Sequence, residues 1–452
     1  MEKTKENHLL TGPISQQLVL LAVPLLLGNI LQQCYNTVDS MIIGRYLGMD
    51  AFAAVGIAGT VMNLMIFILN GFCTGLSVIF SMLYGKADWK EFRREMFTAV
   101  SCGGGAAAAL SLIFLAGVRP VLALIRTPEE LMGYTVEYLQ VIAAGLIAVY
   151  AYNLFSGILR SIGNTLASLL FLLFSVAVNM VLDLAFVAGL QWGTAGAALA
   201  TVLAQMLSAA GCCGYLWCCH RDLIFTGKEV GFHADLLRKT LRFGAASALQ
   251  ESNLYIGKML VQGAVNLLGT GAIAGFTAAL RLEGFCNSFG DGGALAMSVL
   301  ISQNHGAGNP ERVKESLKKG VKFHVILGIV IPFLMYLLTV PGLRLFLGEG
   351  NSEALEQGRS YLQLIALFYI LCFVGSALVG YFRGTGKVHV PVIGTTLNIT
   401  TRVLLAYPMT QRFGLAGLAV STGIGWMMVV SYQLLNLRMI RKNAGKTRNA
   451  AY

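Results

Sequence analysis

Two similar stretches of nine residues decide the fold of this chain: Gly193-Thr-Ala-Gly-Ala-Ala-Leu-Ala-Thr201 and Gly414-Leu-Ala-Gly-Leu-Ala-Val-Ser-Thr422. Five of the nine positions hold the same residue, at an offset of 221. Further pairs follow in the same order: Ser81 and Ser302, Gly85 and Gly306, Arg160 and Arg383, Gly163 and Gly386. A duplication of large apolar units is typical of secondary transporters, so the repeat predicts two lobes.

The composition places both lobes in a membrane. Of the 452 residues 56% are hydrophobic and 12% are charged, about half the charged share of ordinary soluble domains. Apolar runs long enough to cross a hydrocarbon core of ~30 Å predict twelve spans. The predicted spans lie near 16–43, 53–83, 97–118, 135–158, 166–189, 194–218, 241–262, 272–301, 321–340, 361–381, 389–409 and 414–437.

The predicted fold class is therefore all-α integral membrane, with twelve transmembrane helices in two six-helix lobes. The expected domains are an N-lobe at 1–218 with spans one to six, a cytoplasmic linker at 219–240, a C-lobe at 241–438 with spans seven to twelve, and a basic tail at 439–452. Since six spans is an even number, both lobes enter the membrane in the same direction. The repeat is thus parallel, related by a pseudo-two-fold axis along the membrane normal.

The net charge is +11, and the Lys and Arg residues are distributed unevenly over the loops. The N-terminus, the loops after even-numbered spans and the C-terminal tail hold 24 of the 33 Lys and Arg residues, and the opposite loops hold six. The remaining three lie inside spans: Lys258, Arg281 and Arg402. This asymmetry follows the positive-inside rule, so we expect a cell (inner or plasma) membrane protein with both termini in the cytoplasm and no nucleic-acid partner.

Polar residues gather on single faces of three N-lobe spans. Helical spacing aligns Asn29, Gln32, Asn36 and Asp39 in span one, Ser175, Asn179 and Asp183 in span five, and Thr201 and Gln205 in span six. An ionised side chain at mid-bilayer depth costs at least ~2.5–3.5 kcal/mol, so such groups usually face a cavity. Two carboxyls among amide and hydroxyl oxygens suit a small hard cation or a shared proton. The alternative is that these groups only hydrogen-bond the helices together.

At these residues the chain resembles the multidrug and toxic compound extrusion (MATE) family of cation-coupled exporters. The first span matches in Gln33-Cys-Tyr-Asn-Thr-Val-Asp39-Ser-Met-Ile-Ile-Gly44-Arg45. The other matching motifs are Gly71 with Gly75, Arg160-Ser-Ile-Gly-Asn-Thr165, Ser302-Gln-Asn-His-Gly306 and Arg383-Gly-Thr-Gly386. The resemblance implies a two-lobed antiporter that exchanges Na⁺ or H⁺ for a bulky, usually cationic organic compound.

The resemblance also implies a coupling-ion site in the N-lobe. The family places an Asp in span one, an Asn and an Asp four apart in span five, and a Thr in span six. These match Asp39, Asn179, Asp183 and Thr201, which would be metal ligands only if Na⁺ is the coupling ion. No other cofactor is expected.

The C-lobe departs from the family pattern. One branch of the family carries acids in spans seven and ten, but span ten here holds none, and Glu251 in span seven does not align clearly with that branch. Arg281, Glu283 and Arg402 either line a substrate cavity or form internal pairs. The candidate cavity residues are Gln32, Asn36, Asn70, Glu251, Arg281, Glu283 and Arg402. We therefore expect the cation site in the N-lobe alone.

The predicted function is a cation-coupled (H⁺ or Na⁺) antiporter that exports organic, typically cationic compounds by alternating access and works as a monomer in the bilayer. The alternative within the same superfamily is a lipid-linked oligosaccharide or metabolite flippase or exporter, which would show several arginines in its cleft. A membrane enzyme would need converging His, Ser or Cys groups at mid-depth, and none is predicted. A receptor that transports nothing is disfavoured by the buried acids and the repeat. No motif encodes the substrate or separates Na⁺ from H⁺.

Overall fold

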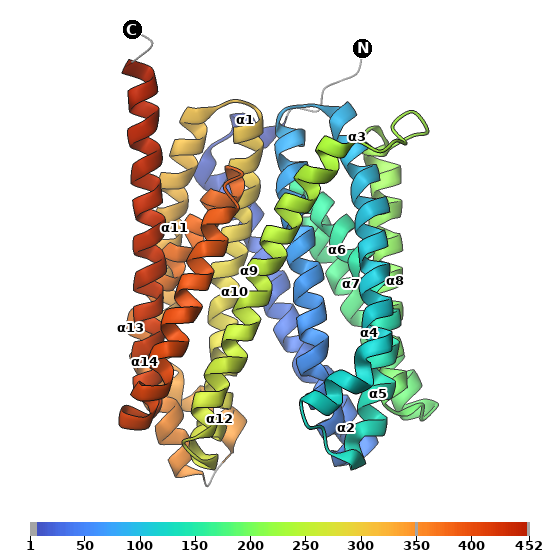
Figure 1. The fold of residues 1–452 in the computed structure, drawn as a ribbon, viewed down its shortest axis with the longest axis vertical. Helices are drawn as coiled ribbons and strands as arrows, with labels where there is room; N and C mark the ends of the chain where they lie inside the picture. Colours follow the sequence, from blue (N-terminus) through green and yellow to red (C-terminus); the bar gives the residue numbers. More distant parts are fainter. Residues whose placement is uncertain (1–6, 349–350, 450–452) are drawn as a thin grey trace. The chain divides into compact units, whose positions relative to one another are not determined.

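The computed structural model describes residues 7–348 and 351–449, without the side chains of Asn36, Thr37, Val38, Ser40, Met41, Met49 and 443–449. The described chain is almost entirely helical (Figure 1). In the N-terminal half the helices are α1 (His8–Thr11), α2 (Ile14–Gly85), α3 (Trp89–Thr98), α4 (Gly104–Leu124), α5 (Glu129–Ala144), α6 (Leu146–Ser161), α7 (Thr165–Asp183) and α8 (Gly193–Cys219). In the C-terminal half they are α9 (Ala234–Asn266), α10 (Thr270–Gly306), α11 (Pro310–Leu337), α12 (Thr339–Leu347), α13 (Ser352–Gly384) and α14 (His389–Asn449). Two π-helices, Ala99–Gly103 and Leu184–Gly189, and a 3₁₀ turn, Arg221–Leu223, complete the elements.

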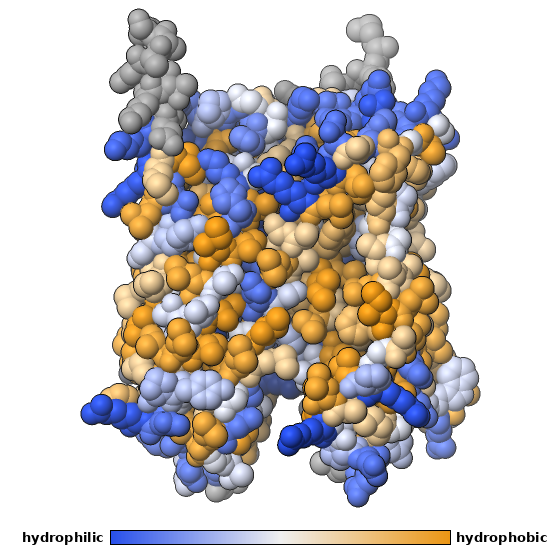
Figure 2. All heavy atoms as spheres, in the orientation of Figure 1, coloured by the Kyte–Doolittle hydropathy of each residue, from blue (hydrophilic) through white to orange (hydrophobic). Residues whose placement is uncertain are grey.

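Over the described residues these helices make up twelve long segments, as the fold class predicts. Eight segments there are apolar enough to span a membrane, and α5 with α6 forms one more span bent by 47°. The helix α14 contains two spans that meet at Gly414. The helices α9 and α10 are also long, but they are less apolar than the other spans. Their 33 and 37 residues extend ~50 Å or more, longer than a bilayer core. Figure 2 shows hydrophobic side chains over the middle of the helices and hydrophilic ones at their ends.

Several predicted boundaries differ from the structure. Span four, expected at 135–158, extends over 129–161 and breaks at Gly145. The helical segment of span three begins at Trp89 rather than near 97, because Asp88 caps it by accepting from the backbone N–H of Glu91. Pro24 does not interrupt α2, whose non-helical backbone angles are at Gly48 (φ 86°, ψ −179°). Spans one and two therefore join at the turn at Gly48.

The backbone repeats the duplication seen in the sequence. Of the eleven described residues with positive φ, all but Gln191 occur in pairs at offsets of 221 to 223: Gly48 and Gly269, Ala87 and Gly308, Arg126 and Gly348, Gly163 and Gly386, Gly193 and Gly414. The helix caps Asp88 and Asn309 are likewise 221 apart. Each half therefore turns at equivalent positions.

Gly414 gives a direct test of these turns. Its φ of 59° and ψ of −146° lie in a region that only glycine adopts without strain. Gly414→Ala is expected to destabilise the protein by about 1–3 kcal/mol, although only Gln357 lies within 4 Å of the new Cβ. Thermal unfolding in detergent measures the effect. Gly105→Ala, at a helical position with open space, is the control, and an equal shift in both variants would contradict a backbone origin.

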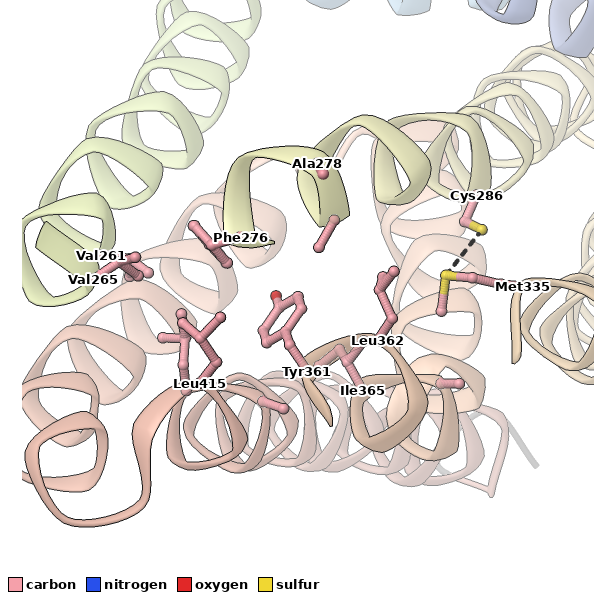
Figure 3. Packing of buried hydrophobic residues seen from close by; sticks show 14 of the residues in the cluster. Val261, Val265, Phe276, Ala278, Cys286, Met335, Tyr361, Leu362, Ile365 and Leu415 are labelled. Atoms are coloured by element: carbon pink, nitrogen blue, oxygen red, sulfur yellow. Dashed lines mark hydrogen bonds between the residues drawn. The ribbon is translucent and has the colours of Figure 1, made fainter. Parts of the chain in front are cut away.

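Contacts divide the chain into two compact units. Unit 1 comprises Met1–Leu10, Leu27–Ser252 and Ser302–Gly308, and unit 2 comprises Thr11–Leu26, Asn253–Ile301 and Asn309–Tyr452. The hydrophobic core of unit 2 lies around Tyr361, which is 0% exposed. In Figure 3 its ring lies among Phe276, Leu362 and Leu415, and the Phe276 ring meets it edge-on at 5.1 Å. The helices α9, α10, α13 and α14 thus share one packed interior.

Within unit 1, an ion pair and the hydrogen bonds around it attach the segment after α8 to α3. Arg93 Nε donates to Glu229 Oε1 (2.9 Å), and Arg93 Nη1 donates to the carbonyl of Asp222 (3.0 Å). The Thr226 hydroxyl and backbone N–H both donate to Glu229 Oε2, at 2.6 and 2.9 Å. These Thr226 hydrogen bonds, followed by the Arg93 pair, lower the pKa of Glu229 to about 2.

This pKa shift predicts a pH-dependent attachment of the linker. Because the pKa of Glu229 is lower in the folded state, its contribution is complete above its ordinary pKa of ~4.3 and is lost as the pH falls toward 2. The protection factors of 221–229 in hydrogen exchange, which are rates relative to those of an unfolded chain at the same pH, are expected to fall between pH 5 and 3 in the native protein. In Glu229→Gln they should be low at both pH values. A linker equally protected in the variant would contradict the role of the carboxylate.

Candidate functional site

Three helices of unit 1 bring together the four residues predicted to bind the coupling ion. Asp39 lies on α2, Asn179 and Asp183 lie one turn apart on α7, and Thr201 lies on α8. Asn179 and Asp183 are 2% and 1% exposed, respectively. Asp183 is the last residue before the π-helix Leu184–Gly189, a local widening of the helix that recurs at functional sites. These side chains, which the helical spacing in the sequence placed on single helix faces, thus lie close together.

The Asn179 amide forms hydrogen bonds with residues of all three helices at this site. Its hydrogen-bond partners orient the amide nitrogen toward Tyr35 Oη (2.8 Å) and Asp183 Oδ2 (2.9 Å), and its oxygen toward the backbone N–H of Thr201 (3.0 Å). The Thr201 hydroxyl donates to the carbonyl of Ala197 (3.2 Å). Asn179 therefore offers the acids an N–H donor, while its oxygen is used within the helix pair.

The two carboxyls face each other and are incompletely satisfied. Asp39 and Asp183 lie close enough to hydrogen-bond, yet Asp39 Oδ1 and Asp183 Oδ1 are buried without a partner. Two adjacent carboxylates in a low-dielectric site repel each other unless a cation or a proton joins them. The oxygen donors also fit Na⁺, for which Asp39, Asp183 and Thr201 would be the ligands, with Asn179 only after its amide turns.

A small polar cavity of about 40 Å³ borders Asn179 and Thr201, but Asp39 and Asp183 are not among its lining residues. It is lined by Gln32, Tyr35, Tyr152, Leu172, Ser175, Val176, Asn179, Thr201, Ala204 and Gln205. Since one water needs about 10–15 Å³ of such space, the cavity holds a few waters but no organic compound. Gln205 Oε1 is buried there without a partner, which marks a further polar group available to such occupants.

Two tyrosines of the site escaped the sequence analysis. Tyr35 accepts from Asn179, and Tyr138, 3% exposed, donates to Met62 Sδ (3.6 Å) within electrostatic range of both acids. A tyrosine inside an apolar span resembles a packing residue, so nothing in its spacing distinguishes it. Its hydroxyl needs a partner when buried, which was the available signal.

The N-lobe residues predicted to line a substrate cavity differ in where the structure places them. Gln32 lines the polar cavity. Asn70 is exposed and does not line it; its carbonyl accepts from the Thr74 hydroxyl (2.8 Å). The Asn36 side chain lies outside the described residues.

In the C-terminal half, the candidates are spread over three helices. Glu251 is half-buried on α9, and Arg281 is exposed on α10. Glu283 is 6% exposed and accepts from Tyr361 Oη (3.0 Å) and Tyr369 Oη (2.9 Å). Arg402 on α14 lies within electrostatic range of Glu283, and its Nε is buried without a partner. Unit 2 thus contains a buried polar cluster of its own.

Comparisons with known proteins agree with this architecture. The family model MatE matches residues 24–185 and again 246–408. The "Probable multidrug resistance protein YpnP" of Bacillus subtilis is 29% identical over 434 residues, covering 93% of each chain. The "Probable multidrug resistance protein NorM" of Thermotoga maritima is 25% identical over 428 residues, covering 91% of this chain and 89% of the relative. A "FAD transporter" of Shewanella oneidensis is 22% identical, covering 90% and 89%.

Solved structures share the fold. "Crystal structure of MATE in complex with MaL6" superposes with a TM-score of 0.91 at 23% identity, covering 98% of this chain and all of that one. "Outward-facing conformation of a multidrug resistance MATE family transporter of the MOP superfamily" gives 0.89 at 23% identity, covering 97% and 98%. With a family model that matches both halves, the chain belongs to the MATE family of multi-pass membrane transporters and is not an enzyme.

Proposed function

We propose that this transporter is a cation-coupled antiporter, in which the carboxyls of Asp39 and Asp183 bind the coupling ion and organic compounds are exported by alternating access. The observation that carries the proposal is the buried carboxyl pair, each member of which has an oxygen without a partner. The similarity to probable multidrug resistance proteins supports export of drug-like compounds. The protein acts as a monomer in the plasma membrane, with both termini in the cytoplasm as the charge distribution predicts.

The geometry favours a proton over Na⁺. The hydrogen-bond partners of Asn179 are best satisfied when its amide nitrogen, rather than its oxygen, is assigned to the side of Asp183. A cation would therefore find fewer oxygen ligands than the residue types suggest, whereas one proton shared by the two carboxyls removes their repulsion without other rearrangement. Tyr35 and Thr201 hold Asn179 in this orientation.

The coupling follows from which state each ligand stabilises. Protonation of the pair stabilises one packing of the helices and the exported compound stabilises the other, so each lowers the affinity for its competitor. Every charge that crosses 100 mV contributes ~2.3 kcal/mol to the driving force, before the concentration gradient is added. The cavity of about 40 Å³ beside Asn179 and Thr201 admits water or an ion, so the compound binds elsewhere or after the cavity widens.

The test is transport by the full-length protein in liposomes. A fluorescent organic cation is followed under an imposed pH gradient and, separately, under a Na⁺ gradient. Movement driven by the pH gradient alone is the expected result. Movement driven only by Na⁺ would replace the proton by Na⁺, and no movement under either gradient would contradict export of organic cations.

The FAD transporter among the relatives motivates a second candidate, an anionic metabolite. The same liposomes loaded with a flavin nucleotide distinguish the two substrate classes. Export of the nucleotide but not of the organic cation would assign the metabolite and keep the ion site.

A further inference from the structure

Polar side chains share one face on each of three neighbouring helices of unit 1. The helices α6, α7 and α8 pack against one another (Figure 1). The polar residues are Tyr152, Ser156 and Arg160 on α6, Ser168 on α7, and Gln205, Ser208 and Cys212 on α8. Their spacing of three or four places those of one helix on a single face. We call these seven residues the polar seam.

At its inner end the polar seam joins the proposed ion site. On α7 and α8 the same faces carry Asn179 and Thr201, whose amide oxygen and backbone N–H lie 3.0 Å apart. The cavity of about 40 Å³ borders both of them, and Tyr152 and Gln205 also contribute to its lining. The three helices therefore share a polar space that holds a few waters next to the ion site.

At its other end the polar seam reaches the last turn of α6. The hydroxyls of Ser156 and Ser168, which are 1% and 5% exposed, lie 2.7 Å apart, and Arg160 Nη1 donates to them at 3.0 and 3.4 Å. Arg160 lies in that last turn, next to a loop that the charge distribution places in the cytoplasm. Because α7 rises ~22 Å between Ser168 and Asp183, the seam extends over more than half of the ~30 Å hydrocarbon core.

Several polar atoms of the seam have no partner in the protein. Outside the seam, the buried Ser111 donates to the backbone carbonyl of Ala143 (2.7 Å). Within it, Ser208 Oγ, Gln205 Oε1 and Arg160 Nε are buried without a partner. Buried polar atoms of this kind usually bind water. The seam therefore offers water sites from the small cavity to the last turn of α6.

The second half of the chain does not repeat this face. Equivalent positions are 223 apart in spans four and five and 221 apart in span six, as the turns show. The counterparts of Tyr152, Ser156, Ser168, Gln205 and Ser208 are Gly375, Val379, Pro391, Trp426 and Val429. Isolated polar residues remain there, among them Asn398 and Gln433. The seam thus accompanies the acid pair, whose counterparts are the apolar Leu260 and Ala406.

We propose that the polar seam is a hydrated route through the interior of unit 1, along which the coupling proton passes between the acid pair and the cytoplasm. This inference rests on the proposed proton coupling at Asp39 and Asp183. Each hydroxyl or water along the seam accepts a proton on one side and gives up its own on the other, so every group ends with the charge it began with. The exported compound is too large for the cavity of about 40 Å³, so proton and compound leave the site by different paths.

The cytoplasmic end of the route carries a fixed positive charge. Among the residues that the structure describes, no carboxylate forms an ion pair with Arg160. The guanidinium is tolerated in the last turn of α6 because the carbonyl end of a helix favours a cation. It disfavours any second cation held beside it. A proton that reaches this end is therefore released rather than retained.

The water in the seam can be detected without transport. Brief X-ray irradiation of the full-length protein forms hydroxyl radicals from bound water, and mass spectrometry gives the oxidation rate of each cysteine. We expect Cys212 to be oxidised severalfold faster than Cys286, although their exposed fractions are 0% and 7%. Cys286 is the matched control because it packs against Met335 in the hydrophobic core of unit 2. Oxidation of Cys212 at the rate of Cys286, or more slowly, would overturn the proposal.

Proton passage is tested by closing the seam with the side chains of the second half. Ser156→Val with Ser208→Val installs the residues found at the equivalent positions 379 and 429. We expect the initial rate of dye movement under a pH gradient to fall severalfold, with unchanged affinity for the dye because the acid pair is intact. Ser111→Val, at a buried serine on α4 outside the seam, should keep the native rate.

The outcomes separate this inference from the proposed function. A native transport rate in the folded double variant would overturn the route and leave the antiport proposal standing. If the double variant does not fold, the comparison of Cys212 with Cys286 in the native protein decides. Absence of dye movement under either gradient in the native protein would overturn the antiport proposal, while the oxidation rates still show whether the seam holds water.

Discussion

Asp39→Asn is expected to abolish gradient-driven transport, with a loss of at least a hundredfold in the initial rate of dye movement. The amide keeps the size of the side chain but can neither share a proton with Asp183 nor carry a charge that the exported compound must displace. The substrate then binds without competition from the ion. Binding of the fluorescent cation should accordingly become independent of pH between 5 and 8, while the native protein binds it more tightly at high pH.

A matched control is available on the same helix. Asp50 follows the turn at Gly48 and is exposed, so Asp50→Asn should transport at the native rate. Asp183→Asn should resemble Asp39→Asn, because either acid alone ionises without a like-charged neighbour. If Asp39→Asn retained coupled transport while Asp183→Asn lost it, the pair would not act as a unit, and Asp183 alone would be the coupling group.

Gly306→Ala is expected to have the largest effect on folding. A Cβ at Gly306 would overlap the carbonyl of Met82, and a Cβ at Gly85 would overlap the carbonyl of Gln303. The ends of α2 and α10 therefore touch backbone to backbone, through two glycines 221 residues apart. Neither carbonyl can rotate away without breaking its own helix, so each substitution should cost about 3 kcal/mol or more.

The yield of monodisperse protein and its Tm in detergent measure this cost. Gly104→Ala, where no atom lies within 4 Å of the new Cβ, should change neither quantity. The double variant Gly85→Ala with Gly306→Ala should be no worse than the sum of the singles, since one separation of the helices relieves both overlaps. A native-like Gly306→Ala would show that the two helix ends are not in contact in the stable state.

The acidic residues of the candidate site could be singled out from the sequence because charge is rare inside a span. Asp39 and Asp183 stand out against apolar neighbours, and the spacing of Asn179 and Asp183 places them on one helix face. Most of the twelve segments followed in the same way from apolar length, while α9 and α10 are more polar than the rest. The orientation of the Asn179 amide did not, because it depends on Tyr35 and on the Thr201 backbone, which lie on other helices.

The C-lobe shows where the sequence reasoning was limited. Glu283 and Arg402 were each visible as buried charges, but their meaning depends on which tyrosines face them. Tyr361 and Tyr369 are two turns apart on α13 and look like ordinary core residues until their hydroxyls are seen on Glu283. Likewise, the left-handed turns at Ala87 and Arg126 carry none of the residues that usually reveal them.

Those two turns have a consequence for how this protein tolerates change. Ala87 and Arg126 occupy backbone positions whose partners, Gly308 and Gly348, are glycines with φ near 70°. The first half thus shows that a side chain is compatible with these bends, and the second half shows that none is required there. A residue that one half tolerates at a bend is therefore a candidate substitution at the equivalent bend of the other half. Exchanging residues between equivalent bends is a rational route to a more stable chain.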